Sequence, residues 1–170
     1  LNELRGDLLT LSGEKAVLDV QEIANFNYTN SNNMYLDARD YYTIINNCNI
    51  FLARVDTTLK KNGVKYMLPE YVAVKSVRAW TYLQLAINYN EIPYFTEPIL
   101  THSAAADVMN QTKMSRDQVI DKLIEDILPF QNPADYTMPK WTVPAASGAP
   151  GVKTEHFFVP IRMLLGEMYL

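Results

Sequence analysis

The 170-residue chain has few of the residue types on which easily recognised chemistry depends. It contains one cysteine, so neither an internal disulfide framework nor a cysteine-based zinc cluster can form. Its two histidines, His102 and His156, are far apart in the sequence and belong to no HExxH-type motif. No apolar run is long enough to cross a bilayer. These shortages argue against a disulfide-rich, cysteine–zinc or membrane-spanning protein.

The chain also lacks an excess of positive charge and the common catalytic motifs. Its net charge of −4 does not favour nucleic acid or an anionic membrane surface. It has no glycine-rich phosphate loop after a strand and no Gly-x-Ser-x-Gly elbow. The acidic pairs Asp37/Asp40 and Glu125/Asp126 fall in predicted helices, where a solvated face is the ordinary position. A glycosidase needs two facing carboxylates, and a pair distant in sequence stays open. We expect no enzyme and no cofactor.

The most informative segment that is present runs from residue 69 to residue 100. Pro69 suits the first turn of a helix. Apolar residues then recur at helical spacing, which predicts a helix over 69–88 with Trp80 in the core. The helix should end near Asn88 to Asn90, because Asn tolerates a left-handed cap and Pro93 forbids continuation. The predicted apolar face comprises Val72, Ala73, Val77, Ala79, Trp80, Leu83, Ala86 and Ile87.

A second helix is predicted over residues 35–60. Its apolar stripe includes Cys48, which we expect to be buried. Asn46, Asn47 and Asn49 are poor interior helix formers, and we expect at least one of them to be buried and bonded to the following helix. Because the link to the 69–88 helix is short, the two helices should be antiparallel neighbours. The stripe comprises Tyr41, Ile44, Ile45, Cys48, Phe51, Leu52, Val55 and Leu59.

The remaining segments complete an all-α prediction. Residues 101–114 are interpreted as a polar connection, and Ser115 with Gln118 forms a capping box that opens a helix. Residues 131–153 are interpreted as an irregular excursion, and a helix resumes from Phe158 with Pro160 in its first turn. The expected fold consists of helical hairpins of tetratricopeptide-like type with long irregular loops. The strict tetratricopeptide consensus is absent.

An asparagine-rich stretch, residues 12–34, has no sustained period and predicts a long surface loop. Asn25, Phe26 and Tyr28 stand together there. An amide offers a donor and an acceptor that match vicinal hydroxyls, and an aromatic face covers the apolar face of a sugar ring. Alternatively, the asparagines only satisfy turn backbone. In the later loop, Trp141 could likewise be a ligand platform or an anchor onto a helix.

Several segments, in order, resemble the SusD/RagB family of nutrient-binding lipoproteins of Bacteroidetes outer membranes. The stretch RAWTYLQL running into YNEIPYFTEP is the clearest, and Asn90 stands where the family usually has Gly. The segments LNELRGD, YYTIINNCNIFLARVD, SRDQVIDKLIEDILPF and IRMLLGEMYL are similar in the same way. The patterned positions are occupied by Arg78, Ala79, Trp80, Tyr82, Leu83, Tyr89, Pro93, Thr96 and Glu97.

The resemblance implies non-catalytic binding of a nutrient glycan or other oligomer at the cell surface. It implies a surface-exposed outer-membrane lipoprotein that partners a TonB-dependent, SusC-like transporter, and no binding of nucleic acid. Residues 1–170 would be an internal fragment, the N-terminal part of one SusD-like domain, incomplete at both ends. Membrane attachment would come only from a lipid anchor outside these residues.

Carried over to this chain, the family's ligand contacts point to Arg5 and to the loop around Asn25, Phe26 and Tyr28. Trp141 is the reserve candidate. Arg5 offers a rigid fork of donors and Tyr28 a stacking face with a polar tip. The alternative for Arg5 is a turn with a local Asp7 pair, worth little at the surface. Two other functional classes stay open: a helical-repeat adaptor that binds proteins, and an enzyme.

Overall fold

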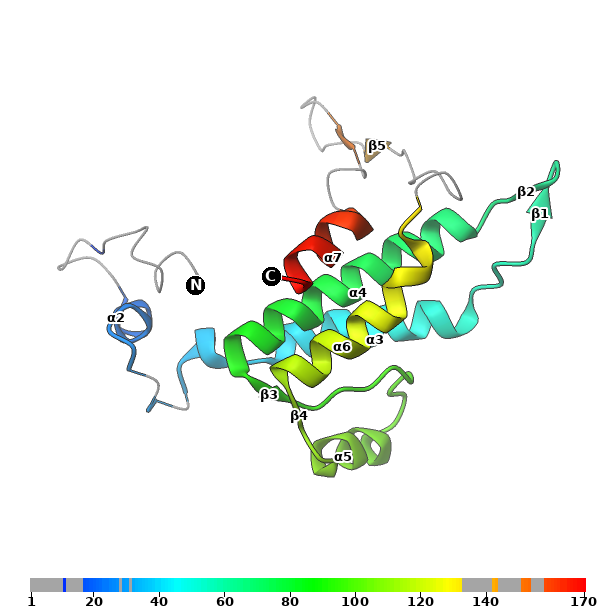
Figure 1. The fold of residues 1–170 in the computed structure, drawn as a ribbon. Coiled ribbons are helices and arrows are strands. Elements are labelled where there is room, and N and C mark those ends of the chain that lie inside the picture. The colour runs from blue at the N-terminus through cyan, green and yellow to red at the C-terminus, as the bar shows by residue number, and fades with distance from the viewer. Residues whose placement is uncertain are drawn as a thin grey trace. The chain divides into compact units, whose positions relative to one another are not determined.

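The computed structural model describes residue 11 and residues 17–27, 29–30, 32–132, 142–143, 151–153 and 158–170. The chain divides into two compact units, Leu1–Asp40 and Tyr41–Leu170, which we describe separately (Figure 1). Among the described residues, no helix combines the length and the apolar character needed to cross a bilayer.

The first unit contains a short helix, α2 (Leu18–Ala24), and a 3-10 turn, η1 (Met34–Leu36). The stretch over 12–34 was expected to be a loop, and the helix within it was not predicted. Ile23 is buried in this unit, with 1% of its surface exposed. The Asn33 side chain caps η1 by accepting a hydrogen bond from the Tyr35 N–H.

The second unit is built from helices, which confirms the expected all-α class with helical hairpins and long connections. The antiparallel strand pairs are only two residues long: β1 (Lys60–Lys61) with β2 (Val64–Lys65), β3 (Glu91–Ile92) with β4 (Met114–Ser115), and β5 (Thr142–Val143) with β6 (Val152–Lys153). The helices are α3 (Arg39–Arg54), whose first two residues belong to the first unit, α4 (Leu68–Tyr89), α5 (His102–Asn110), α6 (Arg116–Ile127), the 3-10 turn η2 (Leu128–Phe130) and α7 (Ile161–Met168).

Helix α4 lies among the other long helices (Figure 1). It begins as predicted, with Pro69 in its first turn, and it ends at Tyr89, followed by the cap residue Asn90, which has a φ of 63°. The predicted positive-φ cap is therefore confirmed. The Asn90 N–H completes the end by bonding the Ala86 carbonyl at 2.9 Å.

Two antiparallel pairings share α4. On one side, the Tyr41 and Tyr89 rings lie 6.3 Å apart while Asn49 bonds Arg78, so α3 runs antiparallel to α4 as predicted. On the other side, β3 follows the end of α4 and pairs with β4, which leads directly into α6. The capping box of Ser115 and Gln118 starts α6, again as predicted. Helix α4 is thus the common member of two helical hairpins.

The exposed side of α4 was predicted wrongly. Trp80 is 40% exposed and Ile87 is 43% exposed, although both were expected in the core. The buried face instead includes Lys75, Ser76 and Arg78, whose polar groups find partners. The apolar stripe identified one face of a helix that is in fact enclosed on several sides.

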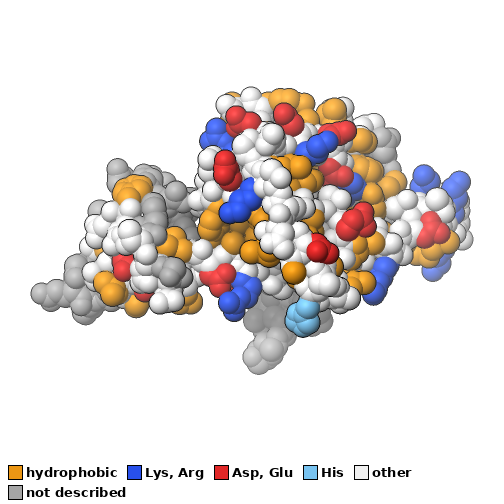
Figure 2. Space-filling view, turned by 90° about the horizontal axis from the view of Figure 1, so that it is seen from below, with side chains coloured by type: hydrophobic (Ala, Val, Ile, Leu, Met, Phe, Trp, Pro, Cys, Tyr) orange, Lys and Arg blue, Asp and Glu red, His pale blue; other side chains and the backbone are white. Residues whose placement is uncertain are grey.

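The helix predicted over 35–60 ends at Arg54, and a β-hairpin follows. Asn62 and Gly63 have φ values of 52° and 79°, the two positive values of a type I′ turn. The backbone twist of a type I′ turn matches the right-handed twist of the two strands that it joins. Lys60 and Lys61 therefore pair with the second strand and do not extend the helix. The hairpin is exposed and projects from the helices (Figures 1 and 2).

Two further boundaries differ from prediction. Residues 102–110 form α5 rather than a polar connection, because the Thr101 side chain caps the helix by accepting from the Ala104 N–H. Helix α7 begins at Ile161, with Pro160 as its cap, and not at Phe158. Within 131–153, the described part includes the β5–β6 pair, which was not expected.

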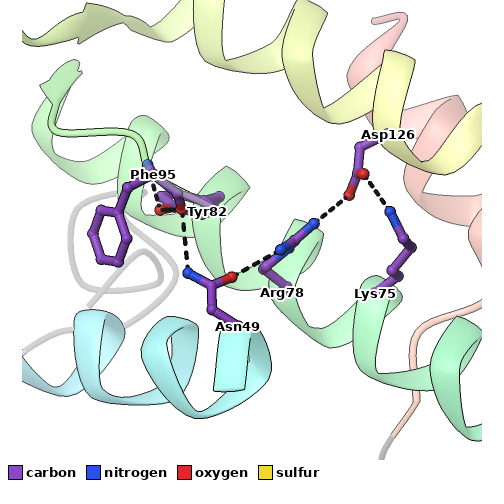
Figure 3. Close-up of polar contacts among 6 residues, drawn as sticks. All are labelled: Asn49, Lys75, Arg78, Tyr82, Phe95 and Asp126. Atoms are coloured by element: carbon purple, nitrogen blue, oxygen red, sulfur yellow. Dashed lines mark hydrogen bonds and ion pairs between the residues drawn. The ribbon is translucent and has the colours of Figure 1, made fainter. Parts of the chain in front are cut away.

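A buried polar cluster ties α3, α4 and α6 together (Figure 3). Arg78, only 4% exposed, donates to Asn49 Oδ1 and to Asp126 Oδ2, both at 2.8 Å. Lys75 donates to the other Asp126 oxygen. The expectation that at least one asparagine of α3 is buried and bonded to the next helix is confirmed by Asn49. We name Asn49, Lys75, Arg78 and Asp126 the ion cluster.

The extended chain after α4 has its backbone satisfied by side chains. Tyr82 Oη donates to the Phe95 carbonyl at 2.7 Å and accepts from the Phe95 N–H at 3.1 Å. Asn46 bonds both the N–H and the carbonyl of Ile99, at 2.7 and 3.0 Å. Buried backbone groups need partners, and beyond β3 the segment belongs to no strand pair that the structure describes. Asn46 and Asn49 are poor helix formers, and their presence in α3 is explained by the exit segment that they bond.

Candidate functional site

Asn25 and Phe26, two of the predicted site residues, lie at the C-terminal end of α2. The Asn27 N–H bonds the Glu22 carbonyl at 2.8 Å, and the Phe26 N–H bonds the Ile23 carbonyl at 3.1 Å. This pair of bonds is the Schellman pattern of a helix end. The residue that follows the cap is then left-handed and is usually Gly. Here it is Phe26, with a φ of 55°.

A phenylalanine in this conformation is strained. For an L-residue, the left-handed region costs roughly 1–2 kcal/mol because the Cβ atom approaches the following carbonyl. The Phe26 side chain is 58% exposed, so burial of the ring does not offset that cost fully. Strain of this kind in a bulky residue is an observation from which function can be inferred.

Asn25 stands beside this ring as the cap residue of α2. It is exposed, and its side-chain amide makes no hydrogen bond to any residue that the structure describes. Among the described residues, an amide donor and an amide acceptor thus have no partner, and the next residue carries an exposed aromatic side chain. This combination suits a ligand with adjacent hydroxyl groups and an apolar face.

The neighbouring asparagines are structural instead. Asn33, 1% exposed, donates to the Asp19 carbonyl at 2.8 Å and to Glu22 Oε2 at 3.0 Å. Asn30 donates to the same carboxylate at 3.1 Å. Asn27 Oδ1 accepts from the Thr29 hydroxyl at 2.8 Å. The alternative interpretation, that the asparagines hold the turn, is correct for these three, and they fix the loop that carries Asn25 and Phe26.

The other predicted site residues, Arg5, Tyr28 and Trp141, lie outside the described residues. Of the five, the structure describes Asn25 and Phe26, which are neighbours in the sequence. Sequence reasoning did not identify Glu22 as the acceptor that organises the loop. Its separation of eight and eleven residues from Asn30 and Asn33 gives no local pattern.

The described part of the chain offers few residues suited to acid–base catalysis or to metal binding. Within it, no group of three His, Cys, Asp or Glu side chains lies close enough to hold a metal ion. Asp126 was expected on a solvated face, which is wrong, since it pairs with Lys75 and Arg78. Burial acts to raise the pKa of Asp126, but the Lys75 hydrogen bond and the Arg78 charge hold it below its ordinary value. Asp126 is therefore a carboxylate that neutralises two cations, and it is unsuited to act as a general acid.

A second candidate is a groove between α4, α6 and α7. Its volume is about 470 Å³. Its rim carries Asp117, Asp121 and Glu167 against the single cation Arg116, which is itself paired with Asp117 at 3.3 Å. The groove therefore has an acidic rim. The apolar lining consists of Leu83, Ile87, Ile120, Met168, Tyr169 and Leu170.

A scan against protein-family models, a search of curated proteins and a search of solved structures each returned no match to the chain.

Proposed function

We propose that the protein binds a nutrient glycan, or a similar oligomer, without transforming it. The observation that carries the proposal is Phe26, an exposed aromatic residue in a strained left-handed conformation, next to Asn25, whose side-chain amide has no hydrogen-bond partner among the described residues. An aromatic ring can cover the apolar face of a sugar, and an amide can bond its adjacent hydroxyl groups. Neither residue is a nucleophile or an acid, so the pair binds and does not catalyse.

The resemblance to the SusD/RagB family supports the same proposal and extends it. Several of its patterned positions have clear structural roles here: Arg78 joins the ion cluster, and Tyr82 fixes the exit segment at Phe95. The resemblance therefore involves residues on which the architecture depends. On this basis we propose a tetratricopeptide-like arrangement, a place on the outer-membrane surface by way of a lipid anchor, and a TonB-dependent transporter as partner.

The test uses single alanine variants of Arg5, Asn25 and Tyr28, with Trp141→Ala as the alternative site. Each variant is screened for binding to a panel of oligosaccharides, and its melting temperature is measured in parallel. Loss of binding at an unchanged melting temperature supports the site. Chromatography of the incubated oligosaccharide is the check on catalysis, and a shortened product would contradict the proposal.

If the alanine variants of Arg5, Asn25 and Tyr28 bind normally and Trp141→Ala does not, the site lies in the segment 131–153. The assignment to Asn25 and Phe26 is then wrong. If wild-type protein binds no member of the panel, glycan binding itself is contradicted. The melting temperatures distinguish both results from a simple loss of the folded state.

A helical-repeat adaptor is the second candidate, and the groove between α4, α6 and α7 favours it. The acidic rim and apolar lining would complement an amphipathic helix of another protein with apolar anchors and basic flanks. The variant Asp121→Asn/Glu167→Gln should weaken such a peptide and leave oligosaccharide binding unchanged. Equal peptide binding by wild type and variant would remove this candidate.

A further inference from the structure

The β1–β2 hairpin concentrates positive charge in a chain that is acidic overall. Lys60, Lys61 and Lys65 lie within six consecutive residues, and all three are exposed, while the whole chain has a net charge of −4. Figure 2 shows several Lys and Arg side chains, with an acidic side chain among them, at the end of the second unit where Figure 1 places this hairpin. The charge of the whole chain therefore conceals a local basic surface. We name Lys60, Lys61, Val64 and Lys65 the hairpin tip.

The arrangement of these lysines works against the stability of the hairpin. Lys60 lies directly opposite Lys65 in the register, and like charges in that position repel. None of the three ammonium groups forms an ion pair with a carboxylate among the described residues. Because successive side chains of a strand point to opposite faces, Lys60 and Lys65 share one face of the hairpin, and Lys61 lies on the other face with Val64. Folding therefore places Lys60 beside Lys65, and neither has a carboxylate partner among the described residues.

Apolar side chains accompany the lysines. Val64, opposite Lys61, is 67% exposed, and Leu59 and Tyr66, which flank the strands, are each 45% exposed. The type I′ turn at Asn62 and Gly63 gives the projecting strands a defined end. The result is a narrow, convex, well-formed element that carries both cations and exposed apolar groups.

We propose that the hairpin tip docks on the anionic headgroups of a lipid bilayer. Lysines near such a surface are attracted to its lipids, and their long stems can lie along apolar surface while the ammonium groups stay with the headgroups. Val64 and Leu59 can enter the interface, where Tyr66 also has a favourable place. A convex tip fits a soft, flat surface, whereas small-molecule sites are concave. The mixture of charge and apolar area favours a bilayer over an acidic polymer, which would need the charges alone.

The test measures co-sedimentation with vesicles of phosphatidylcholine alone or mixed with phosphatidylglycerol. Lys60→Gln/Lys65→Gln removes two charges from the hairpin tip. The control variant, Lys113→Gln/Lys122→Gln, removes two charges elsewhere: Lys122 lies in α6, and Lys113 lies in the segment before it. Affinity for mixed vesicles should fall roughly thirtyfold in the first variant, about fivefold for each lysine. It should change less than about twofold in the second, because salt screens distant charges.

A second pair of variants tests the apolar contribution. Val64→Ser should weaken binding, and Val17→Ser, at a valine with the same exposed fraction of 67%, should not. No tip variant should lower the melting temperature appreciably, since the affected side chains are exposed, and Lys60→Gln/Lys65→Gln can raise it slightly by removing the repulsion between the two lysines.

The proposal is overturned if wild type binds mixed vesicles no better than pure phosphatidylcholine, or if the two lysine variants lose equal affinity. It is also overturned if dextran sulfate, a soluble polyanion, binds the tip while the vesicles do not. That last result would assign the surface to an acidic polymer.

Discussion

Replacing Asp126 by alanine should destabilise the protein by about 3 kcal/mol. The change leaves Lys75 and Arg78, 8% and 4% exposed, without their shared carboxylate. Removal of one member of a buried ion pair costs roughly 3–5 kcal/mol, because the remaining charge is buried and unpaired. The Asp126 side chain is itself 22% exposed, which places the expected cost at the lower end of that range.

Glu125→Ala provides a matched control, one residue earlier on the same helix and with the same change in charge. Glu125 pairs with Lys122 at 3.0 Å, but the two side chains are 73% and 52% exposed. An exposed pair contributes below about 1 kcal/mol. Urea denaturation followed by circular dichroism gives both free energies of unfolding. Equal costs for the two variants would refute the argument that burial of the ion cluster decides the difference.

The same cluster predicts a dependence of stability on pH. The pKa of Asp126 is lower in the folded protein than its ordinary value of about 3.9, because Lys75 and Arg78 favour the carboxylate. Its contribution is therefore complete above the ordinary value and is lost as the pH falls through the lower, folded value. Asp126→Asn should lack this part of the acid dependence. A variant whose stability falls with acid as steeply as wild type would contradict the assignment.

Two further predictions concern the helices. Trp80→Ala should cost about 2 kcal/mol, below the roughly 3–5 kcal/mol of a fully buried aromatic, because Trp80 is 40% exposed. Leu83→Ala, at 2% exposure, should cost at least as much, and a larger loss for Trp80→Ala in denaturation would show that the indole is buried. Cys48 should react slowly with a thiol reagent in the native state, because burial raises the pKa of its thiol. Rapid labelling without denaturant would show that the thiol is accessible.

The sequence predicted those features that depend on local patterns. Pro69 and Asn90 bound α4, and Ser115 caps α6, because each residue acts through the backbone within a few positions. The same reasoning missed α5 and the hairpin after α3, although Thr101 and the Asn62–Gly63 pair were local signals of the same kind. Those two errors came from weighting apolar periodicity above cap and turn residues.

Which side of α4 is buried could not be predicted from nearby residues in the sequence. The burial of Arg78 depends on Asn49 and Asp126, which lie 29 and 48 positions away. Without those partners a charged residue is expected at the surface, so the sequence favoured Trp80 for the core instead. Apolar periodicity therefore identified α4 but not the side of it that faces solvent.

The candidate site was predicted in part. The combination of amide and aromatic residues indicated Asn25 and Phe26 as neighbours, and both prove to be exposed. The left-handed conformation of Phe26 has no signal in the sequence, because that position in a Schellman end favours Gly. The separation of Asn25 from the structural Asn27, Asn30 and Asn33 also required the hydrogen bonds.

Oligosaccharide binding by Phe26→Gly, compared with wild type, tests the central claim most directly. Glycine relieves the strain at a φ of 55°, so the variant should be more stable by about 1 kcal/mol, while it lacks the ring. In affinity gels that contain the oligosaccharide selected by the panel, wild type should be retarded and Phe26→Gly should migrate freely. Retardation of Phe26→Gly equal to that of wild type would contradict the claim that the strained ring is the binding surface.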